Sequence, residues 1–200
     1  MKLYVSSTSP YVRKVRIVAL EKGLGSRLEL IDATPWPDPA TVAAANPLGK
    51  VPALVTDDGM VLYDSPVICE YLDVLGGGSA LIPTAGRARW CALRTQALAD
   101  GILDAAVTIV LERRRPMQER SLATEARATA ALRRSLSALA IDLADSHTGD
   151  FGIARIAAAV AIGYVEFRLP DLSLGLDDPT LANFWEQIRL RPSVATTAPH

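Results

Sequence analysis

Hydroxyl side chains gather just before a proline near the start of the chain, in the stretch Ser-Thr-Ser-Pro-Tyr-Val-Arg-Lys at positions 7–14. Ser9 followed by Pro10 has the residue types of a helix start, because serine accepts hydrogen bonds from the first free N–H groups and proline suits the first helical position. A hydroxyl at this place could also act on a bound ligand. The stretch alone therefore predicts a helix start and leaves the chemical role of its hydroxyls open.

A second stretch that could do chemistry is Asn-Pro-Leu-Gly-Lys-Val-Pro-Ala-Leu, residues 46–54. Pro52 stands directly before a predicted strand and has no N–H to give to a sheet. If the peptide bond before Pro52 is cis, Val51 lies in a tight turn with its own N–H and C=O pointing outward. Those groups could pair with the backbone of a peptide-like ligand. A purely structural turn explains the same residues.

Ser-Pro recurs at Ser65-Pro66, again where a strand passes into a helix, and Asp64 precedes it. The free N–H groups and partial positive charge of a helix N-terminus suit a carboxylate, whereas the Asp64 side chain suits an ammonium group. Carboxylate and ammonium on one carbon are the mark of an amino acid. Together the two features predict a ligand with a free α-amino acid end, and helix capping is the alternative.

Short elements must position these three stretches. The first half alternates strands and helices, with the apolar periodicity typical of each, and Asp57-Asp58-Gly59 marks a hairpin because glycine tolerates positive φ. The expected strands are 3–5, 27–32, 53–56 and 60–63, the expected helices are 10–22 and 66–75, and the prolines within 34–39 predict a loop. The order is β-α-β, a long crossover, then β-β-α.

After Gly76-Gly77-Gly78-Ser79, which has the composition of an interdomain linker, the pattern becomes helical. One helix is expected from Arg87 to about Arg113, then one with a leucine stripe, and two more at 153–167 and 181–190; the stripe is Leu132, Leu136, Leu139 and Leu143. We therefore predict a first domain at 1–77, a linker at 78–84 and a helical domain at 85–200.

The composition is that of an ordinary soluble protein, with 50% apolar and 22% charged residues among 200 and a net charge of −1. A charge this small gives no reason to expect nucleic acid or an anionic membrane as the partner. No window reaches the roughly 18 apolar residues of a membrane span, and the first residues lack the long apolar region of a signal peptide. We expect a cytoplasmic protein.

The metal-ligating residue types are few and scattered. Cys69 and Cys91 have neither metal-ligand spacing nor a CxxC partner, and both fall inside predicted helices, so reduced thiols are expected. His147 and His200 are the only histidines and are too isolated for a catalytic triad or a zinc site. We therefore expect no metal.

The three stretches together resemble the soluble glutathione S-transferase family. The resemblance is carried by Ser9-Pro10-Tyr11-Val12-Arg13-Lys14-Val15-Arg16, by residues 46–54 and by Asp64-Ser65-Pro66-Val67-Ile68-Cys69-Glu70-Tyr71-Leu72, and it continues through Ala99-Asp100-Gly101-Ile102 and Ile162-Gly163-Tyr164-Val165-Glu166-Phe167-Arg168. It implies a thioredoxin-like N-terminal domain (β-α-β-α-β-β-α) followed by an all-α C-terminal domain. The chain is most similar to bacterial members with serine, rather than tyrosine or cysteine, near the first helix.

The resemblance implies that glutathione lies along the first domain as a co-substrate. Ser65 and its helix N-terminus would take the γ-glutamyl carboxylate, and Asp64 would fix the α-amino group. Val51, beside cis-Pro52, would bond to the cysteinyl unit through its backbone. Lys50 would neutralise the glycyl carboxylate, as in some serine-type members.

Ser9 is the catalytic residue that the resemblance implies. A thiol with a pKa of about 8.5 is mostly protonated at neutral pH, whereas the thiolate is the nucleophile. A hydroxyl that donates to the sulfur, aided by the helix N-terminus, favours the thiolate. Thr8 is the close alternative for this role and Ser7 a distant one.

The second substrate is expected to be a small hydrophobic electrophile, held against the long helix after the linker. Gln96, Asp100 and Asp104 are the candidates there, and ordinary helix-surface or interdomain polar residues are the alternative. Conjugation, isomerisation and peroxide reduction are the expected reactions, because a deglutathionylating member would carry cysteine where Ser9 stands. Family members are usually homodimers, so we expect a homodimer.

A non-catalytic binding or regulatory protein with the transferase fold is the alternative function. The presence of Lys50, Val51, Pro52, Asp64 and Ser65 argues against it, since a scaffold without a ligand does not need these residues.

One stretch departs from the family pattern, which starts the central helix of the C-terminal domain with Ser/Thr-x-x-Asp. Here the stretch reads Gly152-Ile153-Ala154-Arg155. Glycine supplies no side-chain acceptor, and Arg155 puts a cation in the first turn, against the helix dipole. Asp150 is an alternative cap. We therefore expect Arg155→Asp to raise the melting temperature; a fall would show that Arg155 has a native partner.

Overall fold

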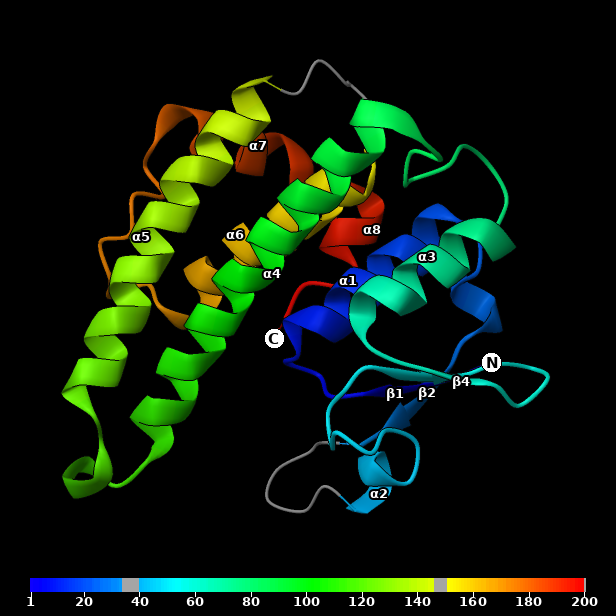
Figure 1. Ribbon diagram of the computed structural model, residues 1–200, viewed down its shortest axis with the longest axis horizontal. Coiled ribbons are helices and arrows are strands. Elements are labelled where there is room, and N and C mark those ends of the chain that lie inside the picture. The colour runs from blue at the N-terminus through cyan, green and yellow to red at the C-terminus, as the bar shows by residue number, and fades with distance from the viewer. Residues whose placement is uncertain (34–39, 146–150, 200) are drawn as a thin grey trace. The chain divides into compact units, whose positions relative to one another are not determined.

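The computed structural model describes residues 1–33, 40–145 and 151–199, and the chain divides into two units (Figure 1). Unit 1 comprises Met1–Thr84 together with Pro192–His200, and unit 2 comprises Ala85–Arg191. The expected loop at 34–39, Asp150 and both histidines lie outside the described residues. No helix within the described part of the chain is long and apolar enough to cross a membrane.

Unit 1 is built on a four-stranded mixed sheet. The strands are β1 (Lys2–Val5), β2 (Glu29–Asp32), β3 (Ala53–Val55) and β4 (Val61–Leu62), and their order in the sheet is β2-β1-β3-β4. β1 runs parallel to β2 and antiparallel to β3, and β4 runs antiparallel to β3. The helix between β1 and β2 provides the crossover that a parallel pair requires.

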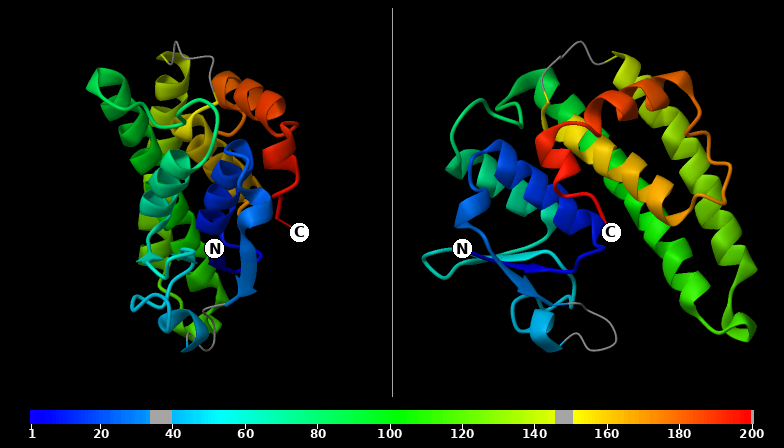
Figure 2. Two further views of the ribbon diagram at one scale, coloured as in Figure 1. Left: turned by 90° about the vertical axis from the view of Figure 1, so that its right-hand side faces the viewer. Right: turned by 180° about the vertical axis from the view of Figure 1, so that it is seen from behind.

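Three helices flank this sheet: α1 (Pro10–Glu21), α2 (Ala40–Ala43) and α3 (Ser65–Leu75). α1 and α3 lie together on one face and α2 lies on the other (Figures 1 and 2). Between the sheet and the helix pair is a core of fully buried side chains, among them Leu3, Val15, Val18, Leu54, Ile68 and Leu72. The order β-α-β-α-β-β-α confirms the thioredoxin-like arrangement.

The C-terminal ends of α1 and α3 are joined by a buried ion pair. Lys22 Nζ lies 3.0 Å from Asp73 Oδ1, and the two side chains are 2% and 6% exposed. Lys22 also donates to the Ser79 carbonyl at 3.0 Å, and Asp73 accepts from the backbone N–H groups of Leu81 and Ile82 at 2.8 and 2.9 Å. The glycine-rich stretch predicted as a linker is therefore fastened to unit 1.

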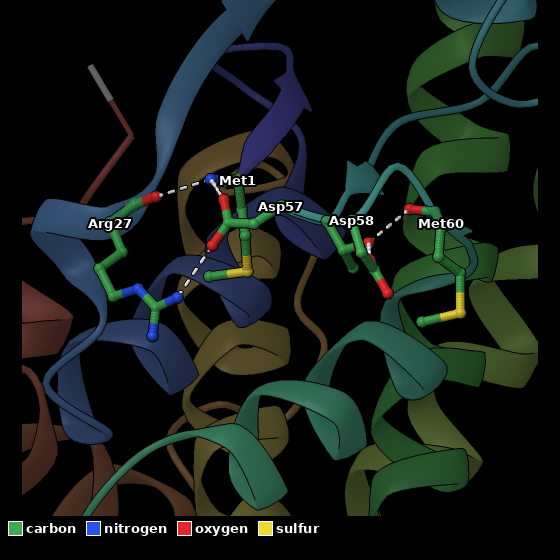
Figure 3. A network of polar contacts seen from close by, with 6 residues as sticks. Met1, Arg27, Asp57, Asp58 and Met60 are labelled. Atoms are coloured by element: carbon green, nitrogen blue, oxygen red, sulfur yellow. Dashed lines mark hydrogen bonds and ion pairs between the residues drawn. The ribbon is translucent and has the colours of Figure 1, made fainter.

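The β3–β4 hairpin is tied to the start of the chain by a polar network (Figure 3). Asp57 pairs with the N-terminal ammonium at 2.7 Å and with Arg27 at 2.9 Å, and the hydrogen bonds from these two cations lower the pKa of its carboxyl. In the turn itself, the Thr56 hydroxyl donates to Asp58 and lies 3.1 Å from the Met60 carbonyl, and the Thr56 hydrogen bond lowers the pKa of Asp58.

The C-terminal segment was predicted with the helical domain, but it packs in unit 1. Its short helix α8 (Pro192–Ala195) lies beside α1 (Figures 1 and 2). Arg13 donates to the Val194 carbonyl at 3.1 Å, and the Ser193 hydroxyl donates to Glu21. These two hydrogen bonds explain why the segment leaves unit 2.

All secondary-structure elements within the described residues of unit 2 are helices. Its helices are α4 (Gly86–Arg114), α5 (Leu122–Asp145), α6 (Ile153–Arg168) and α7 (Pro179–Ile188), close to the predicted ranges. α4 packs against α5 and α6, and α7 packs against α5 and α6. The leucine stripe of α5 is buried as expected, and α6 buries a run of small side chains that includes Ala157, Ala158, Ala159 and Ala161. Small side chains let α6 approach its neighbours closely.

The start of α6 has Gly152 at its N-cap, with no side-chain capping bond. Arg155 has a native partner: its guanidinium carbon lies 5.0 Å from the centre of the Phe184 ring on α7. Burial lowers the pKa of Arg155. Because Arg155→Asp would lose this contact, the structure gives no reason to expect the predicted gain in melting temperature.

Candidate functional site

The sheet register brings the three predicted stretches to one edge of unit 1. Tyr4 pairs with Ala53, so the end of β1, which leads to Ser9, lies beside the start of β3. Leu54 pairs with Leu62, so the end of β4, which leads to Asp64, lies at that same edge. Pairing between strands far apart in the sequence therefore assembles the candidate site.

Ser9 caps α1 as the sequence predicts. Its Oγ accepts from the Val12 N–H at 3.4 Å, and Pro10 occupies the first helical position. A hydroxyl has one proton to donate in addition to its acceptor capacity, and no described residue accepts the Ser9 proton. Ser9 can therefore cap the helix and still donate to a ligand. Thr8 is half-buried beside it, whereas Ser7 is exposed.

The turn before β3 presents an unpaired backbone. The Val51–Pro52 peptide bond is cis, and no described residue hydrogen-bonds to the N–H or C=O of half-buried Val51. The Asn46 side chain, which is 1% exposed, holds this turn with two hydrogen bonds. It donates to the Lys50 carbonyl at 2.7 Å and accepts from the Leu48 N–H at 3.0 Å. The Lys50 side chain is exposed.

The start of α3 lacks a side-chain cap. Asp64 is at the N-cap position, but its carboxylate makes no capping bond, and Pro66 lies in the first turn. Ser65 is 2% exposed, and no described residue bonds to its hydroxyl. The first N–H groups of a helix have no partner within the helix. The start of α3 therefore combines free donors with an exposed carboxylate.

The candidates for the electrophile site, Gln96, Asp100 and Asp104, all belong to α4 in unit 2. Gln96 is 3% exposed, so it is not a surface residue, and its Nε2 has no hydrogen-bond partner in the described part of the chain. Asp100 is half-buried and Asp104 is exposed.

Sequence reasoning missed the burial of Arg13, which is 7% exposed on α1. Its pKa is lowered to about 10 by burial, so it stays charged at neutral pH. The local sequence around Arg13 does not reveal its burial. Arg13 is hydrogen-bonded to Val194 of α8, which is far along the chain.

The cysteines agree with the sequence analysis. Cys69 is buried in α3, Cys91 is exposed in α4, and both are thiols. Among the described residues, no group of three or more potential ligands could hold a metal ion.

Comparison with known proteins bears on what this site does. Residues 8–75 match the family model of the glutathione S-transferase N-terminal domain. Over 201 aligned residues, the whole chain is 39% identical to the uncharacterized GST-like protein YibF of Escherichia coli K12 and covers 98% of it. The chain belongs to the glutathione S-transferase family. This membership confirms the resemblance read from the sequence and, with the structure, the predicted fold.

Solved structures of glutathione transferase family members from Pseudomonas fluorescens Pf-5 extend the similarity. One of these structures holds bound glutathione, and its sequence is 40% identical to this chain. The two structures match with a TM-score of 0.92 over 100% of this chain and 98% of the P. fluorescens chain. Another holds bound S-(propanoic acid)-glutathione, with 40% identity, a TM-score of 0.89 and full coverage of both chains.

Proposed function

We propose that this transferase binds glutathione at the described edge of unit 1, holds its thiol as the thiolate beside Ser9, and transfers it to a small electrophile. The observation that carries the proposal is the backbone of Val51, which makes no hydrogen bond to any described residue and is flanked at the same edge by two helix starts. Glutathione is a peptide with an α-amino acid end, so it needs backbone partners as well as groups for its charged ends. The similar P. fluorescens proteins with bound glutathione support the same assignment.

Each end of glutathione has a matching group in unit 1. The α3 N-terminus with Ser65 suits the γ-glutamyl carboxylate, because free N–H groups and the helix dipole both favour an anion. The unpaired carboxylate of Asp64 suits the α-ammonium. Val51 pairs with the cysteinyl backbone beside Pro52, and the exposed ammonium of Lys50 neutralises the glycyl carboxylate.

Ser9 acts on the sulfur by donating its remaining proton while it accepts from Val12. Each unit by which this lowers the thiol pKa corresponds to about 1.4 kcal/mol in favour of the thiolate. The thiol proton passes to solvent, and the thiolate then attacks the electrophile with formation of a sulfur–carbon bond. In a substitution the leaving group departs with its electron pair; in an addition to an unsaturated acid the electron pair of the double bond takes up a proton from solvent. Thr8 is the alternative donor, and Thr8→Ala is the matched variant that separates the two.

The electrophile is proposed to be small and hydrophobic. Because a similar protein holds S-(propanoic acid)-glutathione, acidic electrophiles belong among the compounds to be tried. We further propose that the protein acts in the cytoplasm as a homodimer. Sedimentation that shows only monomer would contradict the dimer.

The experiment combines retention on glutathione-agarose with turnover of several electrophiles, including 1-chloro-2,4-dinitrobenzene, an unsaturated carboxylic acid and a hydroperoxide. We expect retention, and turnover that falls about 100-fold in Ser9→Ala but little in Ser7→Ala. Retention without turnover of any compound would favour the non-catalytic alternative. Failure to bind glutathione would overturn the proposed function.

A further inference from the structure

Arg13 is a buried cation on α1, one helical turn after Ser9. Residues four apart share a helix face, and a rise of 1.5 Å per residue places their Cα atoms about 6 Å apart along the helix axis. Burial lowers the pKa of Arg13 to about 10, so its guanidinium is charged at neutral pH. Unit 1 therefore holds a buried positive charge close to the helix start that we assign to the thiol.

The charge of Arg13 has no counterion among the described residues. The hydrogen bond described for it goes to the carbonyl oxygen of Val194 on α8, at 3.1 Å, and its Nε is buried without a partner in the described part of the chain. Lys22, at the other end of α1, shows the contrast, because it pairs with Asp73 at 3.0 Å. Burying an unpaired charge is costly, so this cation calls for an explanation.

The elements packed against α1 do not neutralise this charge. These elements are α3, α8 and the 3₁₀ helix Gly25–Arg27. α8 has no titratable side chain. The charged residues on α1 and on the other two elements are Lys14, Arg16, Glu21, Arg27, Glu70 and Asp73. None of these residues is bonded to Arg13, so no ion pair cancels its electric field.

The C-terminal segment shields the guanidinium from water. α8 lies beside α1 (Figures 1 and 2). Val194 is 1% exposed, and Ser193 and Thr197 are 6% and 5% exposed. The Thr197 hydroxyl donates to the Val194 carbonyl at 3.3 Å, the same oxygen that accepts from Arg13. Because buried charges are screened less than surface charges, the field of Arg13 extends further than that of an exposed cation.

Attachment of α8 accounts for only part of this arrangement. A neutral donor could also bond to the Val194 carbonyl, and Ser193 already joins α8 to α1 through its hydrogen bond to Glu21. Neither contact requires a buried positive charge. At a separation of roughly 10 Å and an effective dielectric constant of about 20, one positive charge lowers the pKa of a neighbouring acid by about one unit.

We propose that Arg13 is a second determinant of thiol activation: its buried charge stabilises the sulfur anion of glutathione held beside Ser9. The inference rests on the proposed function and deepens it. Ser9 acts on the sulfur by donating a hydrogen bond, whereas Arg13 acts through space from the next turn of the same helix. The α1 dipole adds to both, since its positive end lies at Ser9.

The experiment is a pH titration of the thiolate absorbance of bound glutathione in the parent protein, Arg13→Met, Arg13→Gln and Arg13→Lys. A cation favours the anionic form of the sulfur, so its removal raises the thiol pKa. We expect a rise of about one unit in Arg13→Met and Arg13→Gln, and a much smaller rise in Arg13→Lys, which keeps the charge. Arg13→Gln keeps a donor for the Val194 carbonyl and preserves the test if Arg13→Met fails to fold.

Two control variants separate the charge from the packing of α8. Ser193→Ala removes the hydrogen bond to Glu21 but keeps the charge of Arg13, so it should lower the free energy of unfolding and leave the bound thiol pKa unchanged. Arg27→Met removes the same charge from another position in unit 1. Because Arg27 is 48% exposed and paired with Asp57, its loss should also leave the thiol pKa unchanged.

A bound thiol pKa that stays at the parent value in both Arg13→Met and Arg13→Gln would overturn the inference and leave the proposed function intact. An equal rise in Ser193→Ala would also overturn it, because the packing of α8 rather than the charge would then set the pKa. If the parent protein does not bind glutathione, or if its bound thiol keeps the free pKa of about 8.5, the proposed function and the inference fail together.

Discussion

Three helices of this protein begin with the same sequence signature, but the two units treat it differently. In unit 2, α7 starts at Asp178-Pro179, and Asp178 accepts from the N–H groups of Thr180 and Leu181 at 2.9 and 3.3 Å. In unit 1, Ser9 accepts only from Val12, at 3.4 Å, and Asp64 caps nothing. An acid or serine before a proline therefore marks a helix start in all three, but of these three helices only α3 has no side-chain capping bond at its start.

A helix start whose N–H groups are capped within the chain serves the fold, whereas an uncapped start can bind a ligand. The opposite ends of α1 and α3 are satisfied within the chain, because the Leu24 and Gly76 N–H groups donate to the Ala19 and Leu72 carbonyls, and the Lys22–Asp73 pair joins the two ends. The uncapped start of α3, by contrast, lies at the sheet edge where Val51 also lies. Substitutions at satisfied positions should cost stability, whereas substitutions at the sheet edge should cost glutathione binding.

The largest effect on stability is expected for Asp73→Ala. Removing one partner of a buried pair leaves Lys22 charged and uncompensated, at a cost of about 3–5 kcal/mol. Chemical denaturation measures the free energy of unfolding. The double variant Lys22→Met/Asp73→Leu should recover much of the loss, and a cost below about 1 kcal/mol for Asp73→Ala alone would show that the pair is not what fastens the linker.

Asp64→Ala should weaken glutathione binding by about 10- to 100-fold, because a charged hydrogen bond to the α-ammonium is lost. Its effect on the free energy of unfolding should be small, since Asp64 makes no capping bond. Calorimetric titration with glutathione and denaturation measure the two quantities. A loss of stability with unchanged affinity would show that Asp64 belongs with the structural caps.

Asp178→Ala is the counterpart in unit 2. It removes an acceptor shared by two N–H groups and should lower the free energy of unfolding by about 1 kcal/mol. The affinity for glutathione should not change. Weaker glutathione binding in a variant that remains folded would contradict the distinction between the two kinds of helix start.

The smallest expected effect is at the start of α6. Gly152 has φ −91° and ψ −174°, a conformation that serine adopts readily, so Gly152→Ser should add a capping bond worth a few tenths of a kcal/mol. Thermal unfolding measures the gain. Arg155→Asp, by contrast, loses the contact with Phe184 and should not stabilise; a rise in melting temperature would show that this contact contributes little.

The sequence predicted what depends on local pattern. The ranges of α1, α3 and the long helices, and the hairpin at Asp57-Asp58-Gly59, follow from apolar period and turn chemistry. The α8 contacts of Arg13, the role of Asp73 at the linker and the ring beneath Arg155 depend on residues distant in the chain. A single sequence contains no signal for such pairings.

The site shows the same division. Ser9, Val51 and Ser65 could be singled out because each stands where a strand meets a turn or helix. Their convergence on one edge follows from the pairing of Tyr4 with Ala53 and of Leu54 with Leu62, which only the structure supplies.

The most direct test of the account is the pKa of the glutathione thiol when bound, followed by thiolate absorbance across a pH series in the parent protein, Ser9→Ala and Thr8→Ala. We expect the bound thiol pKa to lie below its free value of about 8.5, to return toward that value in Ser9→Ala, and to stay low in Thr8→Ala. An unchanged pKa in Ser9→Ala, with glutathione still bound, would contradict the central claim that the helix start at Ser9 holds the thiolate.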